Sequence, residues 1–324
     1  MKKKINVLIV PAGSRVAIPA IKFLKKSKEV RVVSADVDRL AAGLYLSDSG
    51  YIISPFSKEK KFLSDLKIII LKEKVDILIP ALDTVLIKFS SLEDYFQKLG
   101  VKILISPPPA LLITRDKWKT HQFFKNAIPL PRSFVKKEDV NLSYPLFIKP
   151  RWGSGSIDSF KINSKEELEF YYKRIKKPII QEYLEGKEYT VDCLTDLNGK
   201  LLLCIPRERL ETKAGVSNKG RIIENREINN IALKISERLR FRGPFFFQLK
   251  EKKEKLMLTE INARFGGGML LSCAAGPNIY LLAVKLFMGE KIKIPKIKKD
   301  IYFTRFEEEI YLREGQFKKK IKTI

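Results

Sequence analysis

Short apolar runs alternate with amphipathic stretches over the first 110 residues. The runs are almost continuous in Val, Ile and Leu, which is typical of buried parallel strands. They are Ile5–Val10, Val30–Ala35, Tyr51–Ser54, Asp76–Pro80 and Lys102–Ser106. Between them, apolar residues recur every three to four positions, which predicts helices over Val16–Lys26, Lys58–Lys72 and Thr84–Leu99. Repeated strand–helix units of this kind predict an α/β, doubly wound parallel sheet.

From Tyr144 onward the pattern changes to strands that follow one another closely, as in hairpins. The predicted strands are Tyr144–Pro150, Ser156–Ile162, Pro178–Leu184, Glu188–Leu194, Gly199–Pro206, Gly243–Lys250 and Lys255–Asn262. The predicted helices are Asp116–Asn126, Ser164–Lys176, Glu227–Leu239 and Pro277–Met288. This half is therefore expected to be α+β with antiparallel sheets. We expect three parts, residues 1–110, 111–190 and 191–324.

Composition narrows the class of protein. A hydrophobic content of 45% with 10% aromatic residues excludes a disordered chain. Three widely spaced cysteines and the single histidine, His121, do not suit a disulfide framework or a Cys/His metal cluster. No apolar run reaches the roughly 18–20 residues of a membrane span. We expect a cytoplasmic protein with no membrane partner.

The net charge of +26 raises the alternative of a nucleic-acid-binding protein. The positive excess is spread along the chain, and the densest runs, Lys250–Lys255 and Lys293–Lys299, are typical of solvated surface. No basic stripe interleaved with aromatic residues is visible, so a nucleic-acid partner is not expected. The field of such a chain still attracts anionic ligands, and nucleotides are anionic.

Two loops that follow strands are candidates for binding phosphate. Gly13 after the first strand and Asp36 after the second resemble a dinucleotide fingerprint, but that fingerprint needs three glycines, so a scaffold turn is favoured. Lys149 ends an apolar strand and is followed by Gly153-Ser-Gly155-Ser156. Such a loop places an ammonium group and backbone N–H groups around phosphate oxygens, and the alternative is an ordinary hairpin.

Two polar strand ends are candidates for the rest of a nucleotide site. The strand that contains Gln181 ends with backbone that would present a donor and an acceptor to adenine, and Glu188 would accept ribose hydroxyls. Alternation places Glu260, Asn262 and Arg264 on one face, with Gln248 opposite them if their strands pair. Oxygen donors of this kind suit Mg²⁺ that bridges phosphates. The alternatives are a charged turn and a hydrogen-bonded polar face.

Taken in order, these segments resemble the ATP-grasp superfamily. The segments are Arg115–Lys117, Phe147–Gly155, Gln181–Tyr189, Ala214–Gly220, Phe247–Leu249 and Glu260–Gly268. The chain is most similar to a single synthetase domain of the carbamoyl-phosphate synthase large subunit and to stand-alone carboxylate–amine ligases. The resemblance implies a Rossmann-like N-terminal domain, then an ATP-grasp small subdomain that forms a lid, and a C-terminal subdomain that carries the metal site.

The resemblance also implies residue roles. The residues that would contact ATP are Lys117, Lys149, Gly153, Ser154, Gly155, Glu182, Leu184, Glu188, Gly215, Val216 and Ser217. Among them the lysines would hold phosphates, Glu182 and Leu184 would meet adenine, and Glu188 would hold the ribose. The metal ligands, for Mg²⁺ or Mn²⁺, would be Gln248, Glu260 and Asn262. Arg264 and Lys149 would stabilise the transferring phosphoryl group.

The implied function is an ATP- and Mg-dependent ligase. It would activate a small-molecule carboxylate as an acyl phosphate, couple it to an amine or a similar nucleophile such as a thiol, and release ADP and phosphate. Arg207, Arg209 and Arg151 are candidates for holding an anionic group of the substrate, the alternative being exposed strand charges. With one synthetase copy and no glutamine-hydrolysing domain, carbamoyl phosphate synthesis is not expected. A homo-oligomer is compatible with this assignment, and a catalytically silent ATP-binding regulator is the alternative function.

Overall fold

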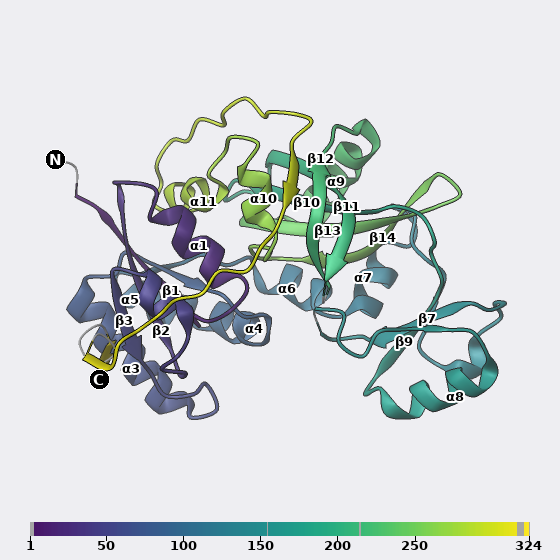
Figure 1. Cartoon of the computed structure of the whole chain (residues 1–324), viewed down its shortest axis with the longest axis horizontal. Helices are drawn as coiled ribbons and strands as arrows, with labels where there is room; N and C mark the ends of the chain where they lie inside the picture. Colours follow the sequence, from purple (N-terminus) through teal and green to yellow (C-terminus); the bar gives the residue numbers. More distant parts are fainter. Residues whose placement is uncertain (1–2, 154, 214, 316–320, 324) are drawn as a thin grey trace.

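Three β-sheets organise the protein. The structure is a computed structural model that describes residues 3–153, 155–213, 215–315 and 321–323. Within these residues an N-terminal parallel sheet, a small antiparallel sheet and a large antiparallel sheet follow one another along the chain. Figure 1 shows the N-terminal sheet at one end, the small sheet at the other, and the large sheet between and above them. The combination of parallel and antiparallel sheets predicted from the sequence is confirmed.

The N-terminal sheet is parallel throughout, in the order β16-β3-β2-β1-β4-β5. Its strands are β1 (Ile5–Val10), β2 (Val30–Asp36), β3 (Ser49–Ile52), β4 (Ile77–Pro80), β5 (Lys102–Ile103) and β16 (Ile321–Thr323). Val7 pairs with Val32 on one side and with Ile77 on the other, and all three side chains are buried. The continuous apolar character of these runs therefore reflects burial on both faces of the sheet. Strand β5 is shorter than the predicted strand Lys102–Ser106.

Helices α1 (Ala17–Leu24), α2 (Ala42–Leu46) and α3 (Glu59–Glu73) connect these strands. The prediction of one helix over Thr84–Leu99 is wrong: the backbone leaves helical geometry at Leu92, which separates α4 (Asp83–Ser91) from α5 (Glu93–Lys98). A further helix, α6 (Pro108–Thr114), begins within the run Pro107–Pro109. Proline is tolerated there because the first helical N–H groups have no intrahelical partner.

The small sheet has its own hydrophobic core. Its strands, in spatial order, are β6 (Ser133–Phe134), β9 (Pro178–Glu182), β7 (Leu146–Pro150) and β8 (Phe160–Ile162). Helix α8 (Lys165–Arg174) is capped by Ser164, and α7 (Lys117–Phe124), capped by Asp116, leads into this unit. The core residues are Leu146, Ile148, Ile162, Leu168, Ile175 and Ile180. Because this cluster is separate from the others, the unit is tied to the rest of the protein mainly through its connecting segments.

The large sheet is antiparallel, in the order β14-β13-β10-β11-β12-β15. Its strands are β10 (Glu188–Thr195), β11 (Leu201–Lys213), β12 (Val216–Ile222), β13 (Gly243–Lys252), β14 (Lys255–Asn262) and β15 (Tyr302–Thr304). Strand β12 was not predicted. Helices α9 (Arg226–Leu239), α10 (Met269–Cys273) and α11 (Ile279–Phe287) accompany this sheet. One hydrophobic cluster contains both Leu78 of the N-terminal sheet and Phe247 of the large sheet, so these two parts share a core.

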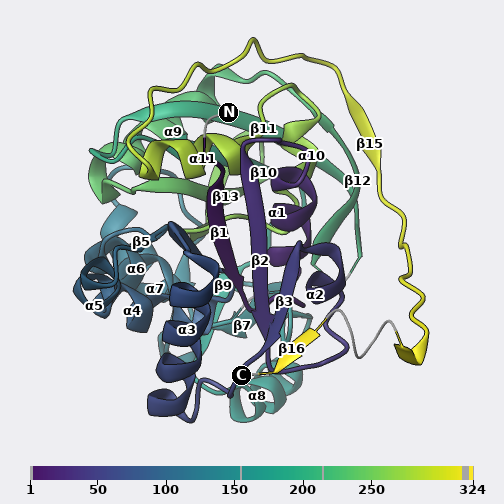
Figure 2. The same cartoon turned by 90° about the vertical axis from the view of Figure 1, so that its left-hand side faces the viewer.

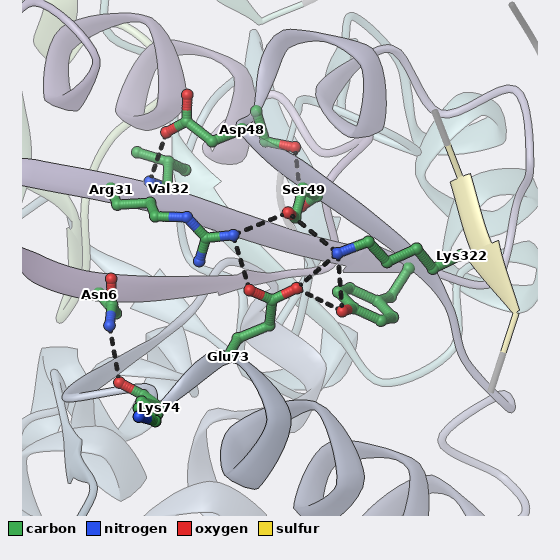
Figure 3. Close-up of polar contacts among 10 residues, drawn as sticks. Asn6, Arg31, Val32, Asp48, Ser49, Glu73, Lys74 and Lys322 are labelled. Carbon is green, nitrogen blue, oxygen red and sulfur yellow. Dashed lines mark hydrogen bonds and ion pairs between the residues drawn. The ribbon is translucent and has the colours of Figure 1, made fainter. Parts of the chain in front are cut away.

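The C-terminal segment returns to the N-terminal sheet. Figure 2 shows it leaving α11, running past the large sheet as β15, and ending beside β3 as β16. Lys322 of β16 donates to the buried carboxylate of Glu73 at 2.8 Å, and Arg31 contacts the same carboxylate at 2.6 Å. Figure 3 shows the side chains of Lys322 and Arg31 pointing toward Glu73. Burial alone would raise the pKa of Glu73, but hydrogen bonds from Lys322, Tyr51 and Arg31 lower it to about 2. The end of the chain is thus held by ion pairing to the buried carboxylate of Glu73.

Candidate active site

A cavity of about 320 Å³ lies between the small sheet and the large sheet. Its lining includes most of the side chains that the sequence assigned to ATP. These lining residues are Lys117, Lys149, Gly153, Glu182, Leu184 and Glu188, together with Gln248 and Glu260 of the candidate metal set. A cleft between two sheets, one of which has an independent core, suits a ligand that is covered after it binds.

Two lysines from different elements face this cavity. Lys149 lies on β7, is 9% exposed, and donates to the carbonyl of Thr259 at 3.4 Å. Burial and, to a smaller extent, the positive charge of Lys117 lower its pKa to about 8. Lys117, at the start of α7, donates to the carbonyl of Gly153 at 2.9 Å. An ammonium group that is buried next to another cation gains from an anionic ligand, as a phosphate would be.

The loop after Lys149 reaches the large sheet. A Cβ atom at Gly215 would lie 2.7 Å from Oγ of Ser156 and 2.8 Å from the carbonyl carbon of Gly155. Gly215 also has a φ of +73°, which side-chain-bearing residues rarely adopt. Glycine at this position therefore lets the two loops touch. Ser154, which the sequence also assigned to ATP, lies outside the described residues.

The end of β9 presents backbone to the other end of the cavity. The carboxylate of Glu182 is occupied, because it accepts from the N–H of Arg132 at 3.0 Å and from Lys252. Burial alone would raise the pKa of Glu182, but the hydrogen bonds from Lys252 and from the N–H of Arg132, together with the charges of these two residues, lower it. With this side chain held, backbone at Tyr183 and Leu184 remains to meet a ligand. This geometry fits adenine recognition through main-chain groups.

The candidate metal ligands lie on the β13–β14 hairpin. Gln248 and Glu260 are directly opposite each other in the register, as strand pairing required. The amide nitrogen of Asn262 donates to Oε1 of Glu260 at 2.9 Å. The described residues contain no group of three or more His, Cys, Asp or Glu side chains placed to hold a metal ion. One carboxylate and two amide oxygens nevertheless fit Mg²⁺, which keeps positions for phosphate oxygens and water.

A second cavity of about 460 Å³ adjoins the first. Both are lined by Ser156, Glu188, Gln248 and Glu260, so they meet at the candidate metal ligands. The second cavity lies between the large sheet and the N-terminal part, which contributes Gly13–Val16 and Asp83. From the large-sheet part it is lined by Arg207, Arg209, Gly215, Val216, Ser217, Arg264 and Gly266–Gly268, and the loop after β7 contributes Gly155. It can hold a second small molecule beside the nucleotide.

Asp83 is a candidate site residue that sequence reasoning missed. Its two carboxylate oxygens accept from Nε and Nη2 of Arg264, 181 residues further along the chain. The guanidinium group also lies 5.3 Å from the ring centre of Phe246. The sequence feature that could have identified Asp83 is its position just after a buried parallel strand, where such sheets place functional groups. Asp83 therefore fixes the orientation of Arg264 in the second cavity.

The three arginines proposed for substrate binding lie in different surroundings. Arg207 is 1% exposed and Arg209 has a 4% exposed side chain, so their interpretation as exposed strand charges is wrong. Arg209 contacts Glu188 and donates to the carbonyl of Gly215 at 2.8 Å. Burial lowers the pKa of Arg209, while Glu188 raises it. Arg151 is not among the residues that line either cavity, because its guanidinium group binds the capping carboxylate of Asp116.

Two family models match the chain. Residues 174–309 match a model described as ATP-grasp in the biosynthetic pathway with Ter operon, and residues 7–104 match the PylC-like N-terminal domain. Residues 174–309 therefore belong to the ATP-grasp superfamily. The resemblance drawn from the ordered motifs is thereby confirmed, and the parallel-sheet domain that precedes them is part of it.

Relatives of this ATP-grasp protein are ligases and synthetases. It is 30% identical over 223 residues to the carbamoyl phosphate synthase large chain of Thermoanaerobacter sp. (strain X514), covering 60% of this chain and 20% of that one. It is 26% identical over 186 residues to the D-alanine–D-alanine ligase of Petrotoga mobilis, covering 51% of this chain and 62% of that one. The chain thus spans only part of each relative.

Solved structures share the ATP-grasp fold. N5-carboxyaminoimidazole synthetase from Staphylococcus aureus, complexed with ADP, superimposes with a TM-score of 0.74 at 17% identity over 92% of this chain and 81% of that one. The L-amino acid ligase from Bacillus licheniformis gives a TM-score of 0.68 at 16% identity over 89% and 75% of the two chains. Among the described helices, none is long and apolar enough to span a membrane.

Proposed function

We propose that this ATP-grasp protein is an ATP- and Mg-dependent ligase that phosphorylates a small-molecule carboxylate and couples it to an amine or a similar nucleophile. The observation that carries the proposal is the junction of two cavities at Gln248 and Glu260. One cavity has two lysines for a triphosphate, and the other has room for an acid beside Arg264. A second cavity that meets the first at the candidate metal ligands suits a substrate that reacts with ATP.

The residues divide the chemistry between them. Lys117 and Lys149 would hold the nucleotide phosphates, and the loop 153–156 would cover them. A carboxylate oxygen of the substrate attacks the γ-phosphorus, and the bond to ADP breaks. The amine then attacks the carbonyl carbon, loses a proton, and displaces phosphate. Arg264, oriented by Asp83, stabilises the charge that develops on the transferring group.

Electrostatic positioning supplies most of what such a reaction requires from the protein. An ion pair at about 4 Å is worth roughly 4 kcal/mol at an effective dielectric constant of about 20, so two lysines and one arginine contribute substantially even though their effects do not add fully. Gln248, Glu260 and Asn262 would hold Mg²⁺, which would neutralise phosphate charge.

The three parts of the chain would then have distinct roles. Residues 1–110 form the scaffold, residues 111–190 contain the lid, and residues 191–324 carry the metal ligands. The separate core of the small sheet supports the lid role, since the unit can pivot without opening a shared core. A closed lid protects an acyl phosphate from water.

The test is ADP release across a panel of amino acids and small carboxylates, with and without amine or thiol acceptors. A ligase releases ADP only when a suitable acid is present, and the Glu260→Gln variant should lose this activity. Glu254→Gln is the matched control, because Glu254 is exposed at the tip of the same hairpin. ATP binding without ADP release for every pair would favour the silent regulator instead. Full activity of Glu260→Gln would refute the metal assignment.

A further inference from the structure

Arg207 is buried at one edge and open at the other. From β11, its Nε donates to Oδ2 of Asp192 at 2.8 Å and to Oγ of Ser272 at 3.0 Å. Its Nη1 contacts Oγ of Ser217 at 3.5 Å. Among the residues that the structure describes, Nη2 has no hydrogen-bond partner. Although the residue is only 1% exposed, it lines the second cavity. The guanidinium group is therefore fixed in place with one donor edge left unused.

Glycine keeps that edge accessible. A Cβ atom at Gly268 would lie 3.0 Å from Nη2 and 3.4 Å from Nη1 of Arg207. A side chain at Gly268 would therefore press against the two nitrogens that a ligand would approach. On the C-terminal segment, the ring of Phe303 lies 5.9 Å from Cζ of Arg207. These neighbours restrict the guanidinium group to a single orientation, which suits planar, two-point recognition of an anion.

Further positive charge gathers at this end of the cavity. Arg305 donates from Nη2 to the carbonyl of Gly267 at 3.0 Å. Burial lowers the pKa of Arg305, and the nearby charges of Arg207 and Arg15 lower it further. Arg15 itself lines the cavity. Asp192 offsets only part of this charge, so an anion at this end would be attracted.

The metal ligands and Arg207 lie on separated strands of the large sheet. Glu260 is on β14 and Arg207 on β11, and β13 and β10 lie between them. Three strand spacings correspond to about 14 Å. The acid that is phosphorylated must place its reacting carboxylate near Glu260 and Arg264. A molecule as small as bicarbonate therefore does not reach from Glu260 to Arg207.

We infer that Arg207 binds a second anionic group of the acid substrate, a carboxylate or phosphate separated by several atoms from the carboxylate that is activated. This inference rests on the proposed ligase function and narrows it to dianionic acids. The two N–H groups on the open edge form charge-assisted hydrogen bonds, whose loss weakens binding by about ten- to a hundredfold.

The test compares acids in matched pairs in the ADP-release assay, with the MgATP concentration saturating. Glutarate is compared with its monoamide, adipate with its monoamide, and 3-phosphonopropionate with butyrate; bicarbonate is included alone. We expect kcat/KM to be at least tenfold higher for the dianion of a pair. In Arg207→Gln the KM for the dianion should rise and the preference disappear, while the KM for ATP stays the same. The comparison of 3-phosphonopropionate with the dicarboxylates distinguishes a phosphate from a carboxylate as the group that Arg207 binds.

Controls keep the outcomes separable. Arg207→Gln leaves Asp192 buried without its counter-charge, so the double variant Arg207→Gln/Asp192→Asn is measured as well. Arg221→Gln removes an arginine from the neighbouring strand β12 outside both cavities and should keep the preference. Equal use of mono- and dianions, activity with bicarbonate alone, or a preference that survives in both Arg207 variants would overturn the inference.

A binding measurement separates this inference from the ligase proposal. Calorimetry with MgADP-saturated protein and glutarate, adipate or 3-phosphonopropionate should give weaker binding for Arg207→Gln than for the unmodified protein. If that difference appears but no acid releases ADP, the anion site stands and the ligase function fails. If a monoanionic acid releases ADP as efficiently as its dianion, the ligase function stands and the inference fails. Absence of binding for all three dianions also overturns it.

Discussion

The protonation of Lys149 should control nucleotide binding at alkaline pH. Its ammonium group is 9% exposed and lies near Lys117, and its pKa is about 8. Below that pH the side chain carries the charge that phosphate needs. As the pH rises through 8 the charge is lost, because burial favours the neutral form of a lysine. Affinity for ATP should therefore fall on the alkaline side.

The size of the effect follows from the pKa. At pH 7 about nine-tenths of Lys149 side chains are protonated, and at pH 9.5 about one in thirty is. If bound phosphate requires the protonated form, the dissociation constant for ATP should rise about 30-fold between these values, which equals roughly 2 kcal/mol. A lysine with its ordinary pKa near 10.4 would change the constant less than twofold over this range.

Isothermal titration calorimetry with ATP in the presence of EDTA measures this directly, without competition from a metal. At pH 8 about half a proton should be taken up per ATP, seen as a binding enthalpy that depends on the buffer. Lys149→Arg should bind with a pH-independent constant, because its guanidinium group stays protonated. Lys149→Ala should bind weakly at every pH. An affinity for the unmodified protein that is constant from pH 7 to 9.5, with no proton uptake, would refute the reasoning.

Three further predictions concern other contacts. Glu73→Gln should lower the free energy of unfolding by about 3 kcal/mol at pH 7, since the pKa of Glu73 is lowered from 4.5 to about 2. In urea titrations the difference in stability from the unmodified protein should shrink as the pH falls below 4.5. A difference that stays constant with pH would contradict this prediction. Asp83→Asn should reduce kcat about tenfold with an unchanged dissociation constant for ATP, because Arg264 loses its orienting partner. An unchanged kcat would show that Asp83 does not orient Arg264 for the reaction. Gly220→Ala should destabilise the protein by about 2 kcal/mol in the same urea titrations. The reason is that the added Cβ atom would lie 2.3 Å from the carbonyl oxygen of Glu208 and 2.5 Å from the ring of Phe303. A variant as stable as the unmodified protein would show that β15 shifts without cost.

Local patterns predicted much of the architecture. The Val- and Ile-rich runs predicted the parallel sheet because buried parallel strands lack polar alternation. The β13–β14 hairpin was predictable because its strands are adjacent in sequence, and alternation then placed Gln248 opposite Glu260. The strand Val216–Ile222 escaped prediction because Ser217, Asn218 and Lys219 interrupt its apolar pattern.

Contacts between distant segments were out of reach. Asp83 meets Arg264 only because the N-terminal part packs against the large sheet through a shared core. The pairing of Ile321–Thr323 with β3 joins segments about 270 residues apart, and no local period encodes it. Likewise the burial of Arg207 depends on Asp192 and Ser272 from other elements. The sequence identified these side chains by type but not by environment.

The most direct measurement of the central claim is a crystal structure of the protein with magnesium and a non-hydrolysable ATP analogue. We expect the purine beside Tyr183 and Leu184, the phosphates at Lys117 and Lys149, and Mg²⁺ at Glu260. The second cavity should remain accessible beside Arg264. A nucleotide bound elsewhere, or a metal ion that makes no contact with the β13–β14 hairpin, would contradict the account.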